Sequence, residues 1–357
     1  MTARIACGSD RAILSDVLNS LADGTACIVP PATGILGVTE ITEQLKPREI
    51  VLYTSGSTGP SRGILRSHES WTASFSPLAD LMSLTSKDSV WVPGPLTSTL
   101  FLYGAIHTDA VGAELLLSDM PGSSATIVHT VPAIAIEILQ NITDFPRLRL
   151  LVVAGDRLPP QVWDLAHGTG IEILEYYGAA ELSFVASRNN PDEELSAFPG
   201  VEYAIRDSVI WVRSPYLAER YVFADGDEAS GPALWRDGWA SVGDLGSMES
   251  GHLNVQGRGD SAVTVGGHTV VTDDVEHIIR RSLCTSEVAV TGIEHPRFGE
   301  ILVAVVVGDF DDSTLRMAAD LLPGPAKPRR WIRADSLPRT ESGKVDRGAI
   351  RRMAASA

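Results

Sequence analysis

The chain has 357 residues, of which 44% are hydrophobic and 21% are charged, so it has enough apolar material for a large core and is not typical of a disordered protein. Its net charge of −16 would repel a polyanion, which argues against a nucleic-acid partner. No apolar run reaches the roughly 20 residues of a membrane span, and the N-terminus lacks the pattern of a secretory signal. The three cysteines, Cys7, Cys27 and Cys284, fit neither a disulfide framework nor a zinc site, so we expect a cytoplasmic protein with free thiols and no membrane partner.

Strands and helices alternate through the first half of the chain. Apolar spacing predicts helices at 12–22 and 68–84. The short apolar run at 50–54 predicts a buried strand that leads into a glycine-rich loop. Further strands are predicted at 125–131 and 148–153, with a helix at 159–168. The segment 171–181 is predicted to begin as a strand and to end in a glycine-containing loop. This alternation predicts a largely parallel α/β sheet, in which ligands bind at the carboxyl ends of the strands.

The character of the sequence changes near residue 197. Up to about residue 257, the segments alternate polar and apolar residues and are separated by Gly and Asp, which predicts antiparallel β structure. The last portion predicts an α+β lobe of about 100 residues, an ordinary size for a small domain. We therefore expect an α/β protein with a large N-terminal domain at 1–259, which includes the antiparallel β part, and a small, mobile α+β C-terminal domain at 260–357.

The glycine-rich loop is the strongest local signal. Hydroxyl groups alternate with glycines in the sequence TSGSTGPSRG, so main-chain N–H groups and hydroxyls can together bind phosphate. A flexible surface loop is the alternative, and the Walker pattern does not fit because no Gly-Lys-Ser/Thr closes the run. The residues concerned are Thr54, Ser55, Gly56, Ser57, Thr58, Gly59 and Arg62.

This loop resembles the T-S-G-S/T-T-G-x-P-K-G pattern of the adenylate-forming superfamily, which includes acyl- and aryl-CoA ligases, firefly luciferase and peptide-synthetase adenylation domains. Arg62 stands in place of the usual lysine and keeps its charge. Four further segments resemble family motifs in the family's order. A Gly-Asp turn or an acid at a helix start is common on its own, but the joint occurrence of these motifs between about residues 47 and 352 is specific.

Two of the four segments are implied to bind nucleotide. Residues 177–181, YGAAE, resemble Y-G-x-T-E, in which the aromatic ring lies against adenine and the glutamate helps to hold Mg²⁺. Residues 242–245, VGDL, resemble T-G-D-L, whose aspartate accepts hydrogen bonds from both ribose hydroxyls. Residues 154–156 fall where the family's backbone contacts adenine. The implied ATP contacts are Gly155, Asp156, Tyr177, Gly178, Ala179 and Asp244, with Glu181 as magnesium ligand and catalytic residue.

The other two segments lie toward the C-terminus. Residues 257–260, GRGD, resemble G-R-x-D, which implies that Arg258 points to the nucleotide and that Asp260 is the hinge between the domains. Gly266 and Gly267 are implied to line a thiol channel. Residues 338–347, PRTESGKVDR, resemble P-R-T-x-x-G-K-x-D-R, whose lysine bridges the substrate carboxylate and the α-phosphate and offsets developing charge. The resemblance implies this role for Lys344, and it implies that Arg62 and Glu181 are the other catalytic residues.

Several positions depart from the family pattern. Most relatives carry a much longer segment before the phosphate loop, so we expect a shortened N-terminal region and a size comparable to o-succinylbenzoate-CoA ligases. Residues 95–97, PLT, lack the histidine of the family's P-L-F/H-H motif, and no acid stands near Thr99 to hold an α-ammonium group. The segments predicted to form the acyl pocket, which include Thr97, Val131 and Gly178, contain a mixture of apolar and small residues. They suggest a fatty or aromatic carboxylate without distinguishing between the two.

The resemblance implies an AMP-forming acid–thiol ligase. With ATP and Mg²⁺, it would activate a small-molecule carboxylic acid to an acyl-adenylate, and then transfer the acyl group to CoA or to the phosphopantetheine of an acyl carrier protein. An adenylating enzyme with an amine or nitrogen oxyacid as acceptor, and a nucleotide-binding paralogue without activity, are the alternatives; a luciferase-like oxygenase has no separate support. The acid, the acceptor, the pathway and the choice between monomer and homodimer stay open.

Overall fold

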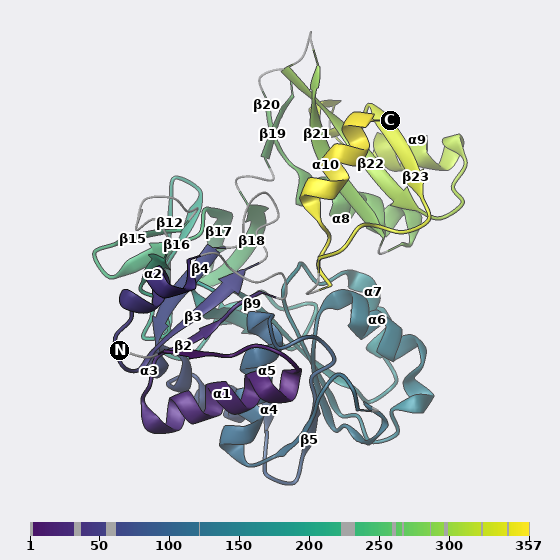
Figure 1. Ribbon diagram of the computed structural model, residues 1–357. Coiled ribbons are helices and arrows are strands. Elements are labelled where there is room, and N and C mark those ends of the chain that lie inside the picture. The colour runs from purple at the N-terminus through teal and green to yellow at the C-terminus, as the bar shows by residue number, and fades with distance from the viewer. Residues whose placement is uncertain are drawn as a thin grey trace.

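The structure is a computed structural model that describes residues 3–356 except 32–36, 55–61, 121, 223–232, 259–261, 266–267, 286, 296–298, 323 and 341–342. The described residues contain four β-sheets and the helices packed on them (Figure 1). The C-terminal sheet and its helices lie above the rest of the molecule in this view. None of the described helices combines the length and the apolar character that crossing a membrane requires.

The first sheet carries the strands on both sides of the predicted phosphate loop. In order across the sheet they are β1 (Arg4–Ile5), β2 (Cys27–Val29), β3 (Glu49–Thr54), β4 (Arg62–Ser67) and β14 (Arg220–Val222). β1, β2 and β3 are parallel, whereas β4 pairs antiparallel with β3 and β14 with β4. The sequence did not predict β4. Because Thr54 and Arg62 are register partners, the two ends of the loop at 55–61 lie side by side.

The second sheet is the predicted parallel sheet. In order, its strands are β11 (Ser196–Ala197), β10 (Ser183–Arg188), β9 (Glu172–Ala179), β8 (Leu150–Val153), β7 (Ile127–Thr130), β5 (Ser89–Trp91) and β6 (Glu114–Leu116). The run from β9 to β6 is parallel, and β10 pairs antiparallel with β9. β9 continues through Tyr177 to Ala179, so these residues belong to a strand and not to the loop that the sequence predicted.

Helices cover both faces of the second sheet. α5 (Thr99–Val111) packs on one face, with α4 (Phe75–Met82) against it, and α6 (Pro132–Gln140) and α7 (Pro160–Ala166) pack on the other. α1 (Asp10–Asp23) contacts both α5 and strands of the first sheet, α3 (His68–Thr72) contacts β4, and α2 (Val38–Glu43) lies near the first sheet. Side chains alternate along a strand. Leu150 and Val152 of β8 therefore pack in one core with α1, α4 and α5, and Leu151 and Val153 pack in another with α6 and α7.

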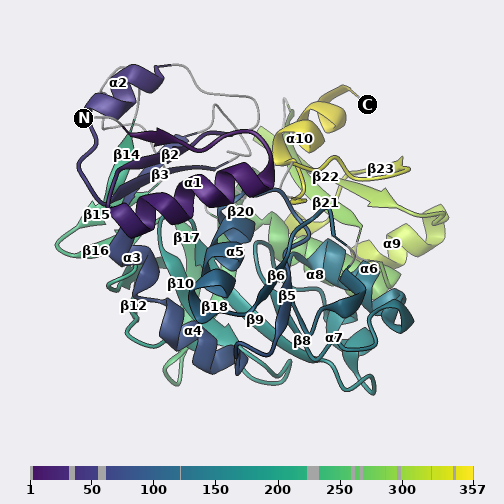
Figure 2. The ribbon, with the colours of Figure 1, turned by 60° about the horizontal axis from the view of Figure 1, so that its bottom comes forward.

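Two helical features differ from the prediction. The helix expected at 68–84 is two helices, α3 and α4, because the Ser74 hydroxyl hydrogen-bonds the Trp71 carbonyl at 2.7 Å and competes with the helical pattern. The sequence did not predict α5, which is buried over its whole middle from Phe101 to Thr108. A helix that is buried all round has no amphipathic stripe to recognise. Figure 2 shows α5 beside α1.

The third sheet is the predicted antiparallel part of the large domain. Its strands are β15 (Leu234–Arg236), β16 (Trp239–Ser241), β13 (Val209–Arg213), β17 (Asp244–Glu249) and β18 (His252–Arg258), with β12 (Glu202–Arg206) beside β13. All its pairings are antiparallel, as expected. β14 comes from the same stretch of sequence but leaves it and joins the first sheet.

The fourth sheet forms the predicted α+β lobe. Its strands are β20 (His268–Val271), β19 (Ala262–Val265), β22 (Gly299–Val307) and β21 (Val288–His295), with β23 (Arg330–Ala334) beside β22, and its helices are α8 (Thr272–Leu283), α9 (Asp312–Asp320) and α10 (Arg347–Ser356). α8 and α9 pack in one core of this lobe, and α10 packs in a smaller one. The domain boundary and the hinge at Asp260 stay predictions, because Asp260 lies outside the described residues.

Candidate active site

Residues of the second sheet, the third sheet and the C-terminal lobe line one cavity of about 720 Å³. Ten of the predicted site residues are among them, although they come from six separate stretches of sequence. These residues are Thr97, Val131, Gly155, Asp156, Tyr177, Gly178, Ala179, Glu181, Asp244 and Lys344. Their grouping is what a shared nucleotide and acid site requires, while the role of each stays a prediction.

The other predicted site residues lie outside the described part of the chain. Of the phosphate loop, Ser55, Gly56, Ser57, Thr58 and Gly59 are not described, and of Thr54 and Arg62 only the backbone is. The same holds for the side chain of Arg258, whose backbone is the register partner of Asp244. The hinge residue Asp260 and the thiol-channel residues Gly266 and Gly267 are likewise not described.

The turn between β9 and β10 positions Glu181. Gly178 pairs with Phe184 across this hairpin, and a Cβ atom at Gly178 would lie only 2.1 Å from the Ser183 carbonyl oxygen, so only glycine fits here. Glu181 is 5% exposed. The Tyr221 hydroxyl donates to its Oε1 at 2.8 Å, and its own carbonyl accepts from the Ala218 amide at 2.8 Å. The glutamate is therefore held by both its side chain and its backbone.

Glu181 suits Mg²⁺ better than a metal that needs a complete protein cage. Among the described residues, no group of three or more His, Cys, Asp or Glu side chains could enclose a metal ion. Magnesium keeps several waters and takes one or two carboxylates together with substrate phosphates. One buried carboxylate in a cavity large enough for a nucleotide fits that requirement.

Asp244 lies at the start of β17, directly after Gly243, which has a φ of +79°. Its side chain is 6% exposed, and the Tyr177 hydroxyl donates to its Oδ2 at 2.7 Å. The predicted adenine and ribose contacts are thus joined by a direct hydrogen bond between the second and third sheets. This bond fixes the direction in which the aspartate faces the cavity.

Lys344 reaches the large domain from the C-terminal lobe. Gly155 follows β8 with a φ of +95°, and a Cβ atom added there would lie 3.0 Å from the Lys344 Cε. Gly343, which directly precedes Lys344, has a φ of +80°, and a Cβ atom added there would lie 3.3 Å from the Val131 Cγ2. The loop that carries the lysine therefore rests between the end of β8 and the start of α6, where the predicted acid and nucleotide subsites meet.

Aromatic side chains that no motif contains form one wall of this cavity. Trp71 and Tyr103 have ring centroids 5.9 Å apart, and Tyr103 and Phe184 are 5.0 Å apart. All three line the cavity and are almost fully buried. In the sequence they are ordinary apolar positions of separate elements, so only their spatial proximity distinguishes them.

A buried arginine next to this wall was also missed. Arg66 of β4 is fully buried and donates from Nη2 to the Ser183 hydroxyl at 2.6 Å and to the Tyr216 carbonyl at 2.5 Å. Burial lowers the pKa of this arginine to about 10. The side chain thereby ties the strand after the phosphate loop to the turn that carries Glu181. Arg66 directly follows the apolar pair Ile64 and Leu65, and this charge beside an apolar run was the available sequence signal.

Two family models match this chain, one in its N-terminal part and one in its C-terminal part. Residues 38–222 match the model of the AMP-binding enzyme family, and residues 274–344 match that of the AMP-binding enzyme C-terminal domain. The uncharacterized acyl-CoA ligase YhfT of Bacillus subtilis is 31% identical over 332 residues, which are 84% of this chain and 67% of that protein. A 2-succinylbenzoate-CoA ligase of Listeria monocytogenes serotype 4b is 25% identical over 328 residues, which are 84% of this chain and 69% of that protein.

Solved structures share the fold. ATP-bound MatB from Rhodopseudomonas palustris superposes with a TM-score of 0.78 at 21% identity, covering 98% of this chain and 88% of that chain. The o-succinylbenzoate CoA synthetase MenE from Bacillus subtilis, in complex with its acyl-adenylate intermediate, gives a TM-score of 0.74 at 21% identity, with 85% and 68% covered. The fold class is therefore that of adenylate-forming enzymes, as predicted. The chain belongs to the AMP-binding enzyme family, which confirms the predicted superfamily and enzyme class.

Proposed function

We propose that this enzyme activates a carboxylic acid with ATP and then transfers the acyl group to the thiol of CoA. The observation that carries the proposal is the gathering of Glu181, Asp244 and Lys344 around one cavity of about 720 Å³. The match to the acyl-CoA ligase YhfT supports the same reaction. The aromatic and apolar wall supports a fatty or aromatic acid.

In the first half-reaction, a carboxylate oxygen of the acid attacks the α-phosphorus of ATP. The bond from that phosphorus to the bridging oxygen breaks, so pyrophosphate leaves and an acyl-adenylate remains. Tyr177 and Gly155 hold the adenine, Asp244 holds the ribose, and Lys344 orients the carboxylate and offsets the growing negative charge. Glu181 would hold the Mg²⁺ ion, which neutralises phosphate charge when it is bound.

In the second half-reaction, the thiol sulfur attacks the acyl carbon. The carbon–oxygen bond to AMP breaks, the thiol proton is released, and a thioester forms. The small domain at 260–357 rotates about Asp260 for this step, which withdraws Lys344 and brings Gly266 and Gly267 to the thiol channel. Such a hinge motion lets one lobe serve two reactions in turn.

Acid-dependent exchange of labelled pyrophosphate into ATP tests the first step. A panel of fatty, aryl and dicarboxylic acids should contain at least one that supports exchange, and Lys344→Ala should slow that exchange roughly 10²- to 10³-fold. Lys327→Ala is the matched control. Lys327 lies in the same lobe, forms an ion pair with Asp320 at 2.7 Å, and does not line the cavity. Exchange in the Lys344 variant at the parental rate would refute the assigned role.

A further inference from the structure

The loop that carries Lys344 is closed by its own hydrogen bonds. The Thr340 amide donates to the Lys344 carbonyl at 2.7 Å, and the Asp346 amide donates to the Pro338 carbonyl at 2.8 Å. Arg339 and Val345 form an isolated β-bridge between the two arms. These bonds join the two arms of the loop, but they do not fix its place on the lobe. Something outside the loop must do that.

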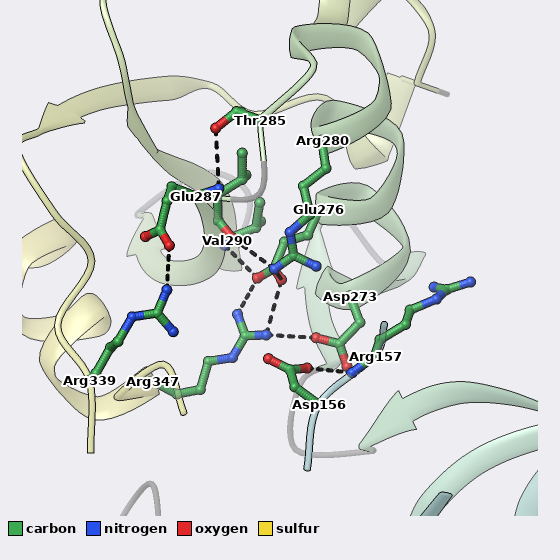
Figure 3. A network of polar contacts seen from close by, with 11 residues as sticks. Asp156, Arg157, Asp273, Glu276, Arg280, Thr285, Glu287, Val290, Arg339 and Arg347 are labelled. Carbon is green, nitrogen blue, oxygen red and sulfur yellow. Dashed lines mark hydrogen bonds and ion pairs between the residues drawn. The ribbon is translucent and has the colours of Figure 1, made fainter. Parts of the chain in front are cut away.

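Two arginines, one on each side of Lys344, attach the loop to the lobe (Figure 3). Arg339 pairs with Glu287, which directly precedes β21, and donates from Nη1 to the Gly343 carbonyl at 2.9 Å. Arg347, the first residue of α10, pairs with Glu276 of α8 through both of its terminal nitrogens. The loop is thus held at both ends by guanidinium–carboxylate pairs.

Glu276 is a rigid anchor. It is 1% exposed, and its Oε1 also accepts from the Val290 amide of β21 at 2.7 Å. Arg280 donates to its Oε2 at 2.8 Å, so both carboxylate oxygens are occupied. Arg347 also donates to Asp273 at 2.9 Å. Burial and the negative charge of Glu276 raise the pKa of Asp273 to about 7, although the positive charge of Arg347 lowers it. Glu276 is the principal partner of Arg347, because it accepts from Arg347 through both of its oxygens, whereas Asp273 accepts through one.

We propose that Arg339 and Arg347 are positioning residues that hold Lys344 at the acid and α-phosphate subsite. This inference rests on the proposed function, in which Lys344 acts only in adenylation. A catalytic group that is displaced by about 1 Å can cost about 10²-fold in rate. The planar guanidinium of Arg347 matches Glu276 at two points, whereas a lysine in its place would keep the charge but lose the two-point geometry.

The test compares Arg347→Lys and Arg339→Lys with the parent enzyme in each half-reaction. Adenylation is followed by pyrophosphate exchange with the best acid of the panel, and thioester formation by supplying the acyl-adenylate of that acid together with CoA. We expect the kcat of exchange to fall at least about tenfold in each variant. The thioester rate from supplied adenylate should stay within about twofold of the parent, because Lys344 is withdrawn from the cavity in that half-reaction.

The control variant is Arg333→Lys. Arg333 pairs with Asp312 at 2.6 Å in the same lobe, both side chains are largely exposed, and neither lines the cavity. It should leave both half-reactions unchanged. Arg339 is the more exposed of the two anchors, so its variant keeps the test valid if Arg347→Lys fails to fold.

Two results would overturn the inference. Equal losses in both half-reactions would show that the arginines only maintain the lobe, and parental exchange in both variants would show that Lys344 needs no anchor. A parent enzyme that supports no exchange with any acid would instead refute the proposed function, so the two failures are distinguishable.

Discussion

Two predicted site residues are held by tyrosine hydroxyls that no motif identified for this role. Tyr177 donates to Asp244, and Tyr221 donates to Glu181. The Tyr221 ring is 2% exposed and packs edge-on against Trp235, with centroids 5.3 Å apart, so the hydroxyl has a fixed position. Because Tyr221 occupies Oε1 of the glutamate, Oε2 is the oxygen that would face a bound metal ion.

Tyr221→Phe should therefore weaken Mg²⁺ binding at the ATP site without unfolding the protein. A hydrogen bond to a charged group contributes about 1.5–3 kcal/mol, and its loss leaves the carboxylate free to turn, so we expect the Mg²⁺ concentration needed for tight ATP binding to rise roughly threefold to tenfold. Calorimetric ATP titrations at several Mg²⁺ concentrations measure this directly.

Tyr203→Phe is the control for this experiment. It removes a tyrosine hydroxyl of the third sheet that donates to the Gly251 carbonyl at 2.8 Å, outside the residues that line the cavity. The metal dependence of this variant should match that of the parent. An unchanged metal dependence in Tyr221→Phe would show that Glu181 needs no such support.

At the scale of elements, the β9–β10 hairpin determines the geometry of Glu181, the predicted magnesium ligand. Ser183, just after Glu181, has a φ of +58°, a left-handed conformation that a residue with a side chain adopts only under constraint. Its hydroxyl accepts from Arg66 and donates to the Tyr216 carbonyl at 2.9 Å. The tight turn at Ser183 and the close packing of Gly178 against Ser183 thus act together to position Glu181.

Gly178→Ala should damage this hairpin. The new methyl group would meet the Ser183 carbonyl oxygen at 2.1 Å, so the strands must separate, at a cost of about 1–3 kcal/mol in the free energy of unfolding. Urea unfolding measures the cost, and pyrophosphate exchange should fall as Glu181 moves. Gly324→Ala is the control, since a Cβ there meets nothing within 4 Å and its φ is ordinary. Equal stability of the two variants would contradict the packing argument.

At the scale of the whole molecule, two buried histidines make stability depend on pH. His107 and His129 lie on α5 and β7, and burial lowers their pKa to about 4 and about 3. Among the described residues, no hydrogen-bond partner exists for the buried His129 Nε2. The folded state therefore favours the neutral imidazoles, while in the unfolded chain they titrate near 6.5.

The sign of the effect follows from proton binding. Below about pH 6.5 the unfolded state binds more protons than the folded state, so the free energy of unfolding falls as the pH falls, by up to about 1.4 kcal/mol per pH unit for each histidine. Urea unfolding at pH 7 and pH 5 should show the loss, and His129→Phe, which cannot be protonated, should show a smaller one. The same pH dependence in both proteins would rule out His129 as a cause.

Much of the fold could be predicted because hydrophobic periodicity acts locally. The strands at β3, β7 and β8, the antiparallel third sheet and the lobe with α8 and α9 follow from short windows of sequence. α5 and the continuation of β9 could not be predicted, because their conformation depends on burial between distant elements. Likewise, ten site residues were recognisable from motifs, whereas Arg66, Trp71 and Tyr103 carry no local pattern.

By itself, the sequence determined the superfamily, the class of chemistry and most of the residues expected to carry it, since a motif preserves the residue types that a reaction needs at fixed spacing. Only the tertiary structure decided what holds those residues in place. The hydroxyl on Glu181, the buried Arg66 and the paired anchors of the Lys344 loop join positions far apart in the chain. Interactions between such positions leave no trace in local spacing, because folding alone brings them together.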